Sequence, residues 1–85
     1  MDAMTNRQGM AVESAEWDHN GSYHVVVAHA YPIRTAGTTR AARDLARRVD
    51  QMNRTKWTRL DRVSMGEDFK MRYHFTVSRL DKSYR

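Results

Sequence analysis

The strictest constraint on the fold of this chain is an alternation between residues 69 and 77. Every second side chain in this stretch is apolar, and the positions between them are polar or basic. The apolar set is Phe69, Met71, Tyr73, Phe75 and Val77, and the intervening set is Lys70, Arg72, His74 and Thr76. Because successive side chains of a strand point to opposite faces of a sheet, the pattern predicts a strand with one buried face and one polar, basic face. Another element of the chain must then cover the apolar face and leave the polar face uncovered.

An amphipathic helix is predicted to be that cover. Thr38 or Thr39 can cap a helix that runs to about Asn53. At 100° per residue, small and aliphatic side chains share one stripe of this helix, namely Ala41, Ala42, Leu45, Ala46, Val49 and Met52. The alanines suit close packing of the helix against a sheet.

Three further stretches read as strands. Residues 23–31 are mostly apolar on both faces and include three consecutive valines, which is typical of a central strand. The Asn20-Gly21 pair favours a hairpin that joins this strand to residues 10–17. Residues 57–65 mix apolar and charged side chains, which a bulge or an edge position would explain. The predicted fold is therefore α+β with the order (β)βαββ: one amphipathic helix on one face of a three- or four-stranded, mostly antiparallel sheet.

The chain length allows one small domain. Its 85 residues and 10.0 kDa are too few for two independent cores. We expect the domain to span residues 10–80, with a flexible N-terminal tail at 1–9 and a polar C-terminal tail at 81–85. A thin core, exposed strand edges and an uncovered sheet face make a homodimer a reasonable expectation.

Several classes of function are excluded or disfavoured by what the sequence lacks. There is no cysteine, so disulfides, thiol nucleophiles and cysteine-based metal sites are excluded. No apolar run approaches the ~20 residues of a membrane span, and the N-terminus has no apolar signal region, so we expect a cytoplasmic protein. The four histidines are not spaced to bind one ion, and no nucleophile elbow or glycine-rich phosphate loop occurs. We therefore expect no metal, no cofactor and no enzymatic activity.

The charge of the chain is concentrated in its second part. The net charge is +5, and residues 34–85 carry 14 of the 15 cations. Most of these cations are arginines, whose planar guanidinium groups suit phosphate and carboxylate. The pattern indicates a surface for nucleic acid or for an acidic protein. The alternative is a genome that uses arginine codons freely, with solvated cations.

Two basic surfaces are the candidate binding sites. The first is a stripe along the predicted helix, made of Arg40, Arg43, Arg47 and Arg54 and flanked by Arg48. The second is the polar face of the sheet, with Arg62, Lys70, Arg72 and His74. The sheet aromatics alternate away from the basic side and are predicted to be core. The sequence thus favours a non-enzymatic module that binds nucleic acid or a nucleoprotein complex. A small basic ribonuclease centred on His74 is a further hypothesis, because a histidine among cations can act on a phosphodiester.

In size, in its β–α–β–β order and in its lack of catalytic motifs, the chain resembles small phage-encoded inhibitors, anti-CRISPR proteins included. The resemblance covers residues 22–80 and is architectural. It implies an inhibitor or adaptor that binds a host protein. Such a protein would use its strand edges, its arginines against an acidic surface, and exposed aromatics such as Trp17 and Trp57.

Overall fold

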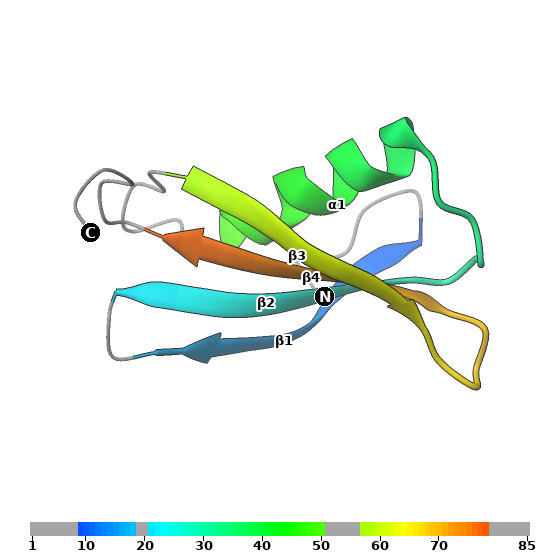
Figure 1. The fold of residues 1–85 in the computed structure, drawn as a ribbon, viewed down its shortest axis with the longest axis horizontal. Helices are drawn as coiled ribbons and strands as arrows, with labels where there is room; N and C mark the ends of the chain where they lie inside the picture. The colour runs from blue at the N-terminus through cyan, green and yellow to red at the C-terminus, as the bar shows by residue number, and fades with distance from the viewer. Residues whose placement is uncertain (1–8, 19–20, 51–56, 79–85) are drawn as a thin grey trace.

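The computed structural model describes residues 9–18, 21–50 and 57–78, and the predicted terminal tails lie largely outside these ranges. One helix lies across one face of an antiparallel four-stranded sheet (Figure 1), which confirms the α+β prediction. No helix of the described residues is long and apolar enough to cross a membrane. The elements are β1 (Met10–Trp17), β2 (Ser22–His29), α1 (Ala36–Arg47), the 3₁₀ turn η1 (Arg48–Asp50), β3 (Trp57–Met65) and β4 (Met71–Ser78).

The strand order β1-β2-β4-β3 places β2 and β4 inside the sheet and β1 and β3 at its edges. All three pairings are antiparallel. The strands β2 and β3 therefore run parallel to each other, with β4 inserted between them. The segment that contains α1 connects these two strands and lies over the sheet as it crosses. The prediction that the valine-rich strand is central is confirmed.

The core lies between α1 and one face of the sheet. Ala42, Leu45 and Ala46 of α1 are buried against it, as the predicted apolar stripe requires. Cross-strand pairing puts Phe75 beside Val25, and both side chains are fully buried. Burying an aliphatic or aromatic side chain of this size contributes about 1.5–3 kcal/mol, so a small number of such residues holds the two layers together. Met52, which belongs to the predicted stripe, lies outside the described residues.

Each edge strand contains a β-bulge, and an acidic residue occupies each bulge. The register shifts at Glu13 in β1 and at Asp61 in β3. A bulge inserts one unpaired residue and resets the alternation of the side chains beyond it. This reset lets Leu60 before the bulge and Val63 and Met65 after it share the helix-facing side of β3. The mixed pattern of residues 57–65 is thereby explained, and β3 has both the bulge and the edge position.

The helix begins earlier than the sequence pattern predicts. Its N-cap is Thr35, and the prediction of Thr38 or Thr39 as the cap is wrong. The Thr35 hydroxyl accepts the backbone N–H of Thr38 at 3.1 Å, and the Thr38 hydroxyl accepts the backbone N–H of Thr35 at 2.8 Å. Thr38 thus serves as the third residue of a reciprocal capping box. The α-helix ends at Arg47, before η1, and the predicted end at Asn53 lies outside the described residues.

Two aromatic residues that the sequence pattern assigns to strands lie beyond them. β4 starts at Met71, so Phe69 belongs to the preceding turn, where it is 66% exposed with a φ of 61°. The prediction of Phe69 as core is wrong because the chain reverses direction at this point. β2 ends at His29, and Tyr31, predicted as its last residue, is 58% exposed. The chain leaves the sheet here to reach α1.

Replacing the cap should measure how much it stabilises the fold. We expect Thr35→Ala to lower the free energy of unfolding by about 1 kcal/mol, because the backbone N–H of Thr38 in the first turn loses its acceptor. Thr35→Asp should retain wild-type stability, since aspartate is an equally good cap. Urea denaturation monitored by circular dichroism measures both. Equal stability of Thr35→Ala and the wild type would show that the capping box contributes nothing.

Candidate anion-binding site

The charged side chains of the described residues separate into two layers of opposite net charge. The helix layer (residues 32–49) carries five arginines and one carboxylate, Asp44: the arginines are Arg34, Arg40, Arg43, Arg47 and Arg48. The sheet layer (the four strands and their hairpin turns) carries four cations against six carboxylates. The cations are Arg59, Arg62, Lys70 and Arg72, and the carboxylates are Glu13, Glu16, Asp18, Asp61, Glu67 and Asp68. The net positive charge of the described residues therefore lies on the helix side.

A hollow opens at the start of α1, with a volume of about 480 Å³. It is lined by Arg34, Thr35, Ala36, Thr39, Arg40 and Arg43, and we call it the arginine hollow. Positions three to four residues apart share one face of a helix, so α1 brings Arg40 and Arg43 together. Arg34 comes from the segment just before the cap. The first turn of α1 contains no acidic residue, so nothing there offsets the positive end of the helix dipole.

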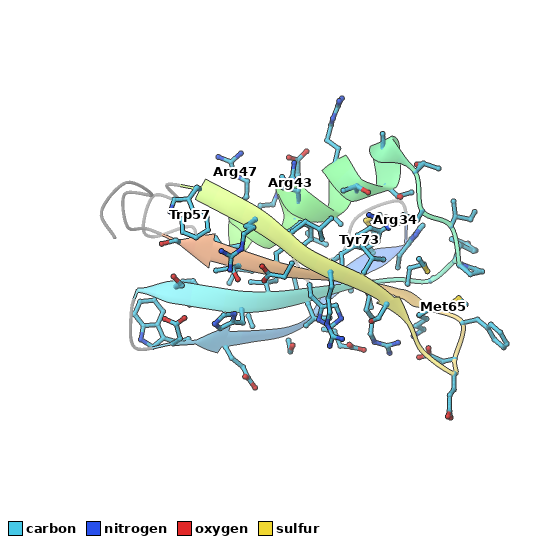
Figure 2. The ribbon with its side chains drawn as sticks, viewed as in Figure 1. Arg34, Arg43, Arg47, Trp57, Met65 and Tyr73 are labelled. Carbon is cyan, nitrogen blue, oxygen red and sulfur yellow. The ribbon has the colours of Figure 1, made fainter. Side chains whose placement is uncertain are left out.

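The three arginines of the hollow keep their donors free. In the described structure none of Arg34, Arg40 and Arg43 forms a hydrogen bond or an ion pair with another residue, and the Nε of Arg43 is buried without a partner. Figure 2 shows Arg43 on α1 and Arg34 on the segment that leads into it. Buried donors are nearly always satisfied in folded proteins. The hollow is therefore lined by three arginines that form no hydrogen bond or ion pair with other described residues, and charged donors of this kind bind anions strongly.

The arginine at the centre of the predicted sheet surface is already paired. Arg72 donates to both carboxylate oxygens of Glu13, at 2.8 and 2.9 Å, and to both of Asp68, at 3.1 and 2.9 Å. These hydrogen bonds are the main cause that lowers the pKa of Asp68, and they also lower the pKa of Glu13. The bulge in β1 contributes directly, because Glu13 is its extra residue. The N–H donors of Arg72 are thus used in hydrogen bonds within the protein.

A second network neutralises the other half of the same face. Asp61, in the bulge of β3, accepts hydrogen bonds from Thr76 at 2.6 Å and from Arg59 at 2.7 Å. Burial raises the pKa of Asp61, but these hydrogen bonds outweigh it and leave the pKa below its usual value. Arg59 also lies over the ring of Trp57, 5.7 Å from its centroid. Both bulge carboxylates therefore bind side chains of the sheet face that α1 leaves uncovered.

His74 lies between the two networks and bonds to a serine. Its Nε2 is 3.0 Å from the hydroxyl of Ser64. Burial, and then the charge of Arg62, lower the pKa of His74, so the ring is neutral at pH 7. A serine beside a neutral imidazole has the spacing of a nucleophile and its base, but no carboxylate hydrogen-bonds this ring in the described residues. The pair therefore lacks the third group that orients a catalytic histidine.

The structure divides the predicted binding residues into separate groups. Arg40 and Arg43 line the arginine hollow, Arg47 and Arg48 follow along α1 and η1, and Arg54 lies outside the described residues. The predicted sheet surface is not one patch of free cations. Lys70 lies in the turn before β4, Arg62 is exposed on β3, Arg72 is paired and His74 is neutral.

Sequence reasoning missed Arg34, which completes the hollow. The available signal was the spacing of Thr35 and Thr38, which fits a capping box. With Thr35 as the cap, the residue before it lies at the start of the helix. With Thr38 or Thr39 as the cap, Arg34 falls in a loop several residues away.

Comparisons with protein-family models, with curated proteins and with solved structures gave no match for this chain. Among the residues that the structure describes, no three histidine or carboxylate side chains are grouped so that they could hold a metal ion.

Titration of His74 should make the fold sensitive to mild acid. Its folded-state pKa is below the ~6.5 of an unfolded chain, so protons bind more tightly to the unfolded state. The contribution of His74 to the free energy of unfolding is therefore complete above about pH 6.5 and is lost as the pH falls towards the folded-state pKa. We expect His74→Gln to reduce the decline of unfolding free energy between about pH 7 and pH 5, as measured by urea denaturation. His24→Gln is the comparison variant. If the unfolding free energy of His74→Gln declines as steeply over this pH range as that of the wild type, this assignment is contradicted.

Proposed function

We propose that this chain is a non-enzymatic binding module that engages nucleic acid through the arginine hollow. One observation carries the proposal: Arg59 and Arg72 of the sheet are paired with carboxylates, whereas the three arginines that line one hollow, Arg34, Arg40 and Arg43, have no partners in the described structure. Two arginines of the sheet are thus used within the protein, while the three arginines of the hollow are available for a ligand.

Phosphate is the anion that this arrangement suits best. A guanidinium group offers parallel N–H donors that match the oxygens of a phosphate. The hollow places three such groups around one opening, beside the positive end of α1. Arg47 and Arg48 continue the basic surface along the same layer. A backbone with several phosphates in a row would contact more of this surface than a single anion.

The charge of the sheet layer favours one orientation of the bound nucleic acid. With six carboxylates against four cations, this layer repels phosphate. The helix layer, with five arginines and one carboxylate, attracts it. The nucleic acid is therefore proposed to lie on the helix side, with the polar sheet face turned away.

An acidic protein surface is the second candidate for the same arginines, as in a phage-encoded inhibitor. The observation that favours it is Trp17, which is 48% exposed on the edge strand β1 and packs edge-on against Tyr23. An exposed tryptophan on a strand edge is a common anchor of protein interfaces. Trp57, the other predicted anchor, is half-buried and less available.

Binding to defined nucleic acids tests the proposal. We expect labelled DNA and RNA to bind at about 50 mM salt, as measured by fluorescence anisotropy. Three phosphate contacts imply a loss of affinity between 50 and 200 mM salt of roughly 40-fold for a duplex and roughly 20-fold for a single strand. Arg40→Glu should weaken binding at least tenfold at the lower salt, since a charge-assisted hydrogen bond contributes about 1.5–3 kcal/mol.

Two further variants separate the hollow from general charge effects. Arg62→Glu makes the same charge reversal on an exposed arginine of the sheet layer and should leave affinity within about twofold. Thr35→Asp keeps the helix cap but puts a carboxylate into the hollow, so it should weaken binding without unfolding the protein. An equal loss in Arg40→Glu and Arg62→Glu would reject the hollow as the site. No binding at about 50 mM salt would reject nucleic acid and favour the protein partner.

A further inference from the structure

Large apolar side chains are exposed together at one end of the sheet. Four residues form this group, which we call the apolar end: Tyr31 is 58% exposed, Ile33 52%, Met65 54% and Phe69 66%. Exposed apolar groups scattered singly are normal, but a cluster marks a binding surface. Trp17, also exposed, lies at the opposite end, where β1 finishes.

The topology places these four residues at the same end of the sheet. β2 and β3 end where β4 begins, and His29, Met71 and Met65 form the last cross-strand row. Tyr31 lies two residues after His29 in the chain, and Phe69 lies two residues before Met71. Figure 1 shows the segment after β2 and the turn between β3 and β4 leaving the sheet at the same end, which is also the end where α1 begins.

The ring of Tyr31 is held in place although it is exposed. It packs edge-on against the ring of His29, with the centroids 5.6 Å apart, and His29 itself is buried. Pro32 fixes the backbone that follows, and the Ile33 N–H donates to the Tyr31 carbonyl at 2.8 Å. A ring that is fixed in advance loses little freedom when a ligand stacks on it.

Phe69 occupies a position that normally takes glycine. Its φ of 61° is in the left-handed region, and among the described residues it is the one non-glycine residue with a positive φ. Its N–H closes the turn by donating to the Gly66 carbonyl at 3.0 Å. Hairpin turns use glycine or asparagine at such positions because a bulky side chain is strained there. Neither local conformation nor core packing favours an exposed phenylalanine here, and such strain is concentrated at functional sites.

The apolar end adjoins the arginine hollow, because Arg34 directly follows Ile33. Phosphates suit the hollow, and flat aromatic faces suit unstacked bases. The β3–β4 turn has no excess of positive charge, because Asp68 is paired with Arg72 and Glu67 offsets the charge of Lys70, so bases rather than backbone suit this end. A duplex keeps its base faces stacked inside and has none to offer. A single strand exposes both its phosphates and the faces of its bases, and each nucleotide carries one of each.

We propose that the apolar end is a base-stacking platform, with Tyr31 and Phe69 as its aromatic surfaces, and that the nucleic acid held by the arginine hollow is single-stranded. This inference rests on the proposed function and specifies its ligand. The backbone of the strand contacts Arg34, Arg40 and Arg43, and its bases turn towards Tyr31 and Phe69.

The test compares a labelled single-stranded oligothymidine of about 15 nucleotides with a duplex of equal length, using the full chain at about 50 mM salt. We expect the single strand to bind at least tenfold more tightly. Phe69→Gly removes the ring and relieves the positive φ, so the fold should be retained while single-strand affinity falls about tenfold, in line with the loss of one stacked base. Tyr31→Leu should have a similar effect. Trp17→Leu, which removes an exposed ring from the opposite end, is the matched control and should change nothing.

The outcomes separate this inference from the proposed function. If Phe69→Gly and Tyr31→Leu bind the single strand as tightly as the wild type while Arg40→Glu does not, the stacking platform is rejected and the arginine hollow stands. Equal affinity for single strand and duplex also rejects the platform. If neither nucleic acid binds, both proposals fail. Thermal melting followed by circular dichroism establishes that each variant is folded.

Discussion

A single helix covers only one face of the four-stranded sheet, so the other face must carry side chains that water or one another can satisfy. β4 meets this constraint by alternation, with Tyr73 and Phe75 towards α1 and Arg72, His74 and Thr76 on the uncovered face. The edge strands then complete the uncovered face. A bulge in each places one carboxylate there, Glu13 beside Arg72 and Asp61 beside Thr76. Arg72, Thr76 and Arg59 on the uncovered face are thereby paired with these two carboxylates.

This pairing decides which cations remain for a ligand. Arg59 and Arg72 each bind a carboxylate within the sheet layer, whereas Arg34, Arg40 and Arg43 gather around the hollow at the start of α1. The same end of the molecule carries the exposed rings of Tyr31 and Phe69. Arg59 and Arg72 thus have structural roles in the sheet layer, and the proposed site lies at the end of the molecule where α1 begins and where the β3–β4 turn leaves the sheet (Figure 1).

Much of the fold could be predicted from the sequence because it depends on local periodicity. The alternation around Tyr73 and the apolar stripe around Leu45 define the sheet face and the helix that covers it. The site was harder to predict. Arg72 and Glu13 are 59 residues apart, and their contact depends on a bulge that no local pattern locates. Phe69 fitted the alternation of β4, but the turn before Met71 removes it from the strand. Arg34 was missed because three neighbouring threonines offered competing caps.

The central claim is that a ligand approaches the helix layer and not the polar sheet face. The most direct measurement is a titration of the ¹⁵N-labelled protein with single-stranded oligothymidine, followed by backbone amide signals in two-dimensional NMR. The account predicts progressive shifts for residues 31–43 and for Phe69, with the amides of Arg72, His74 and Thr76 unchanged. Shifts concentrated on those three residues of β4, with those of the arginine hollow unchanged, would contradict it.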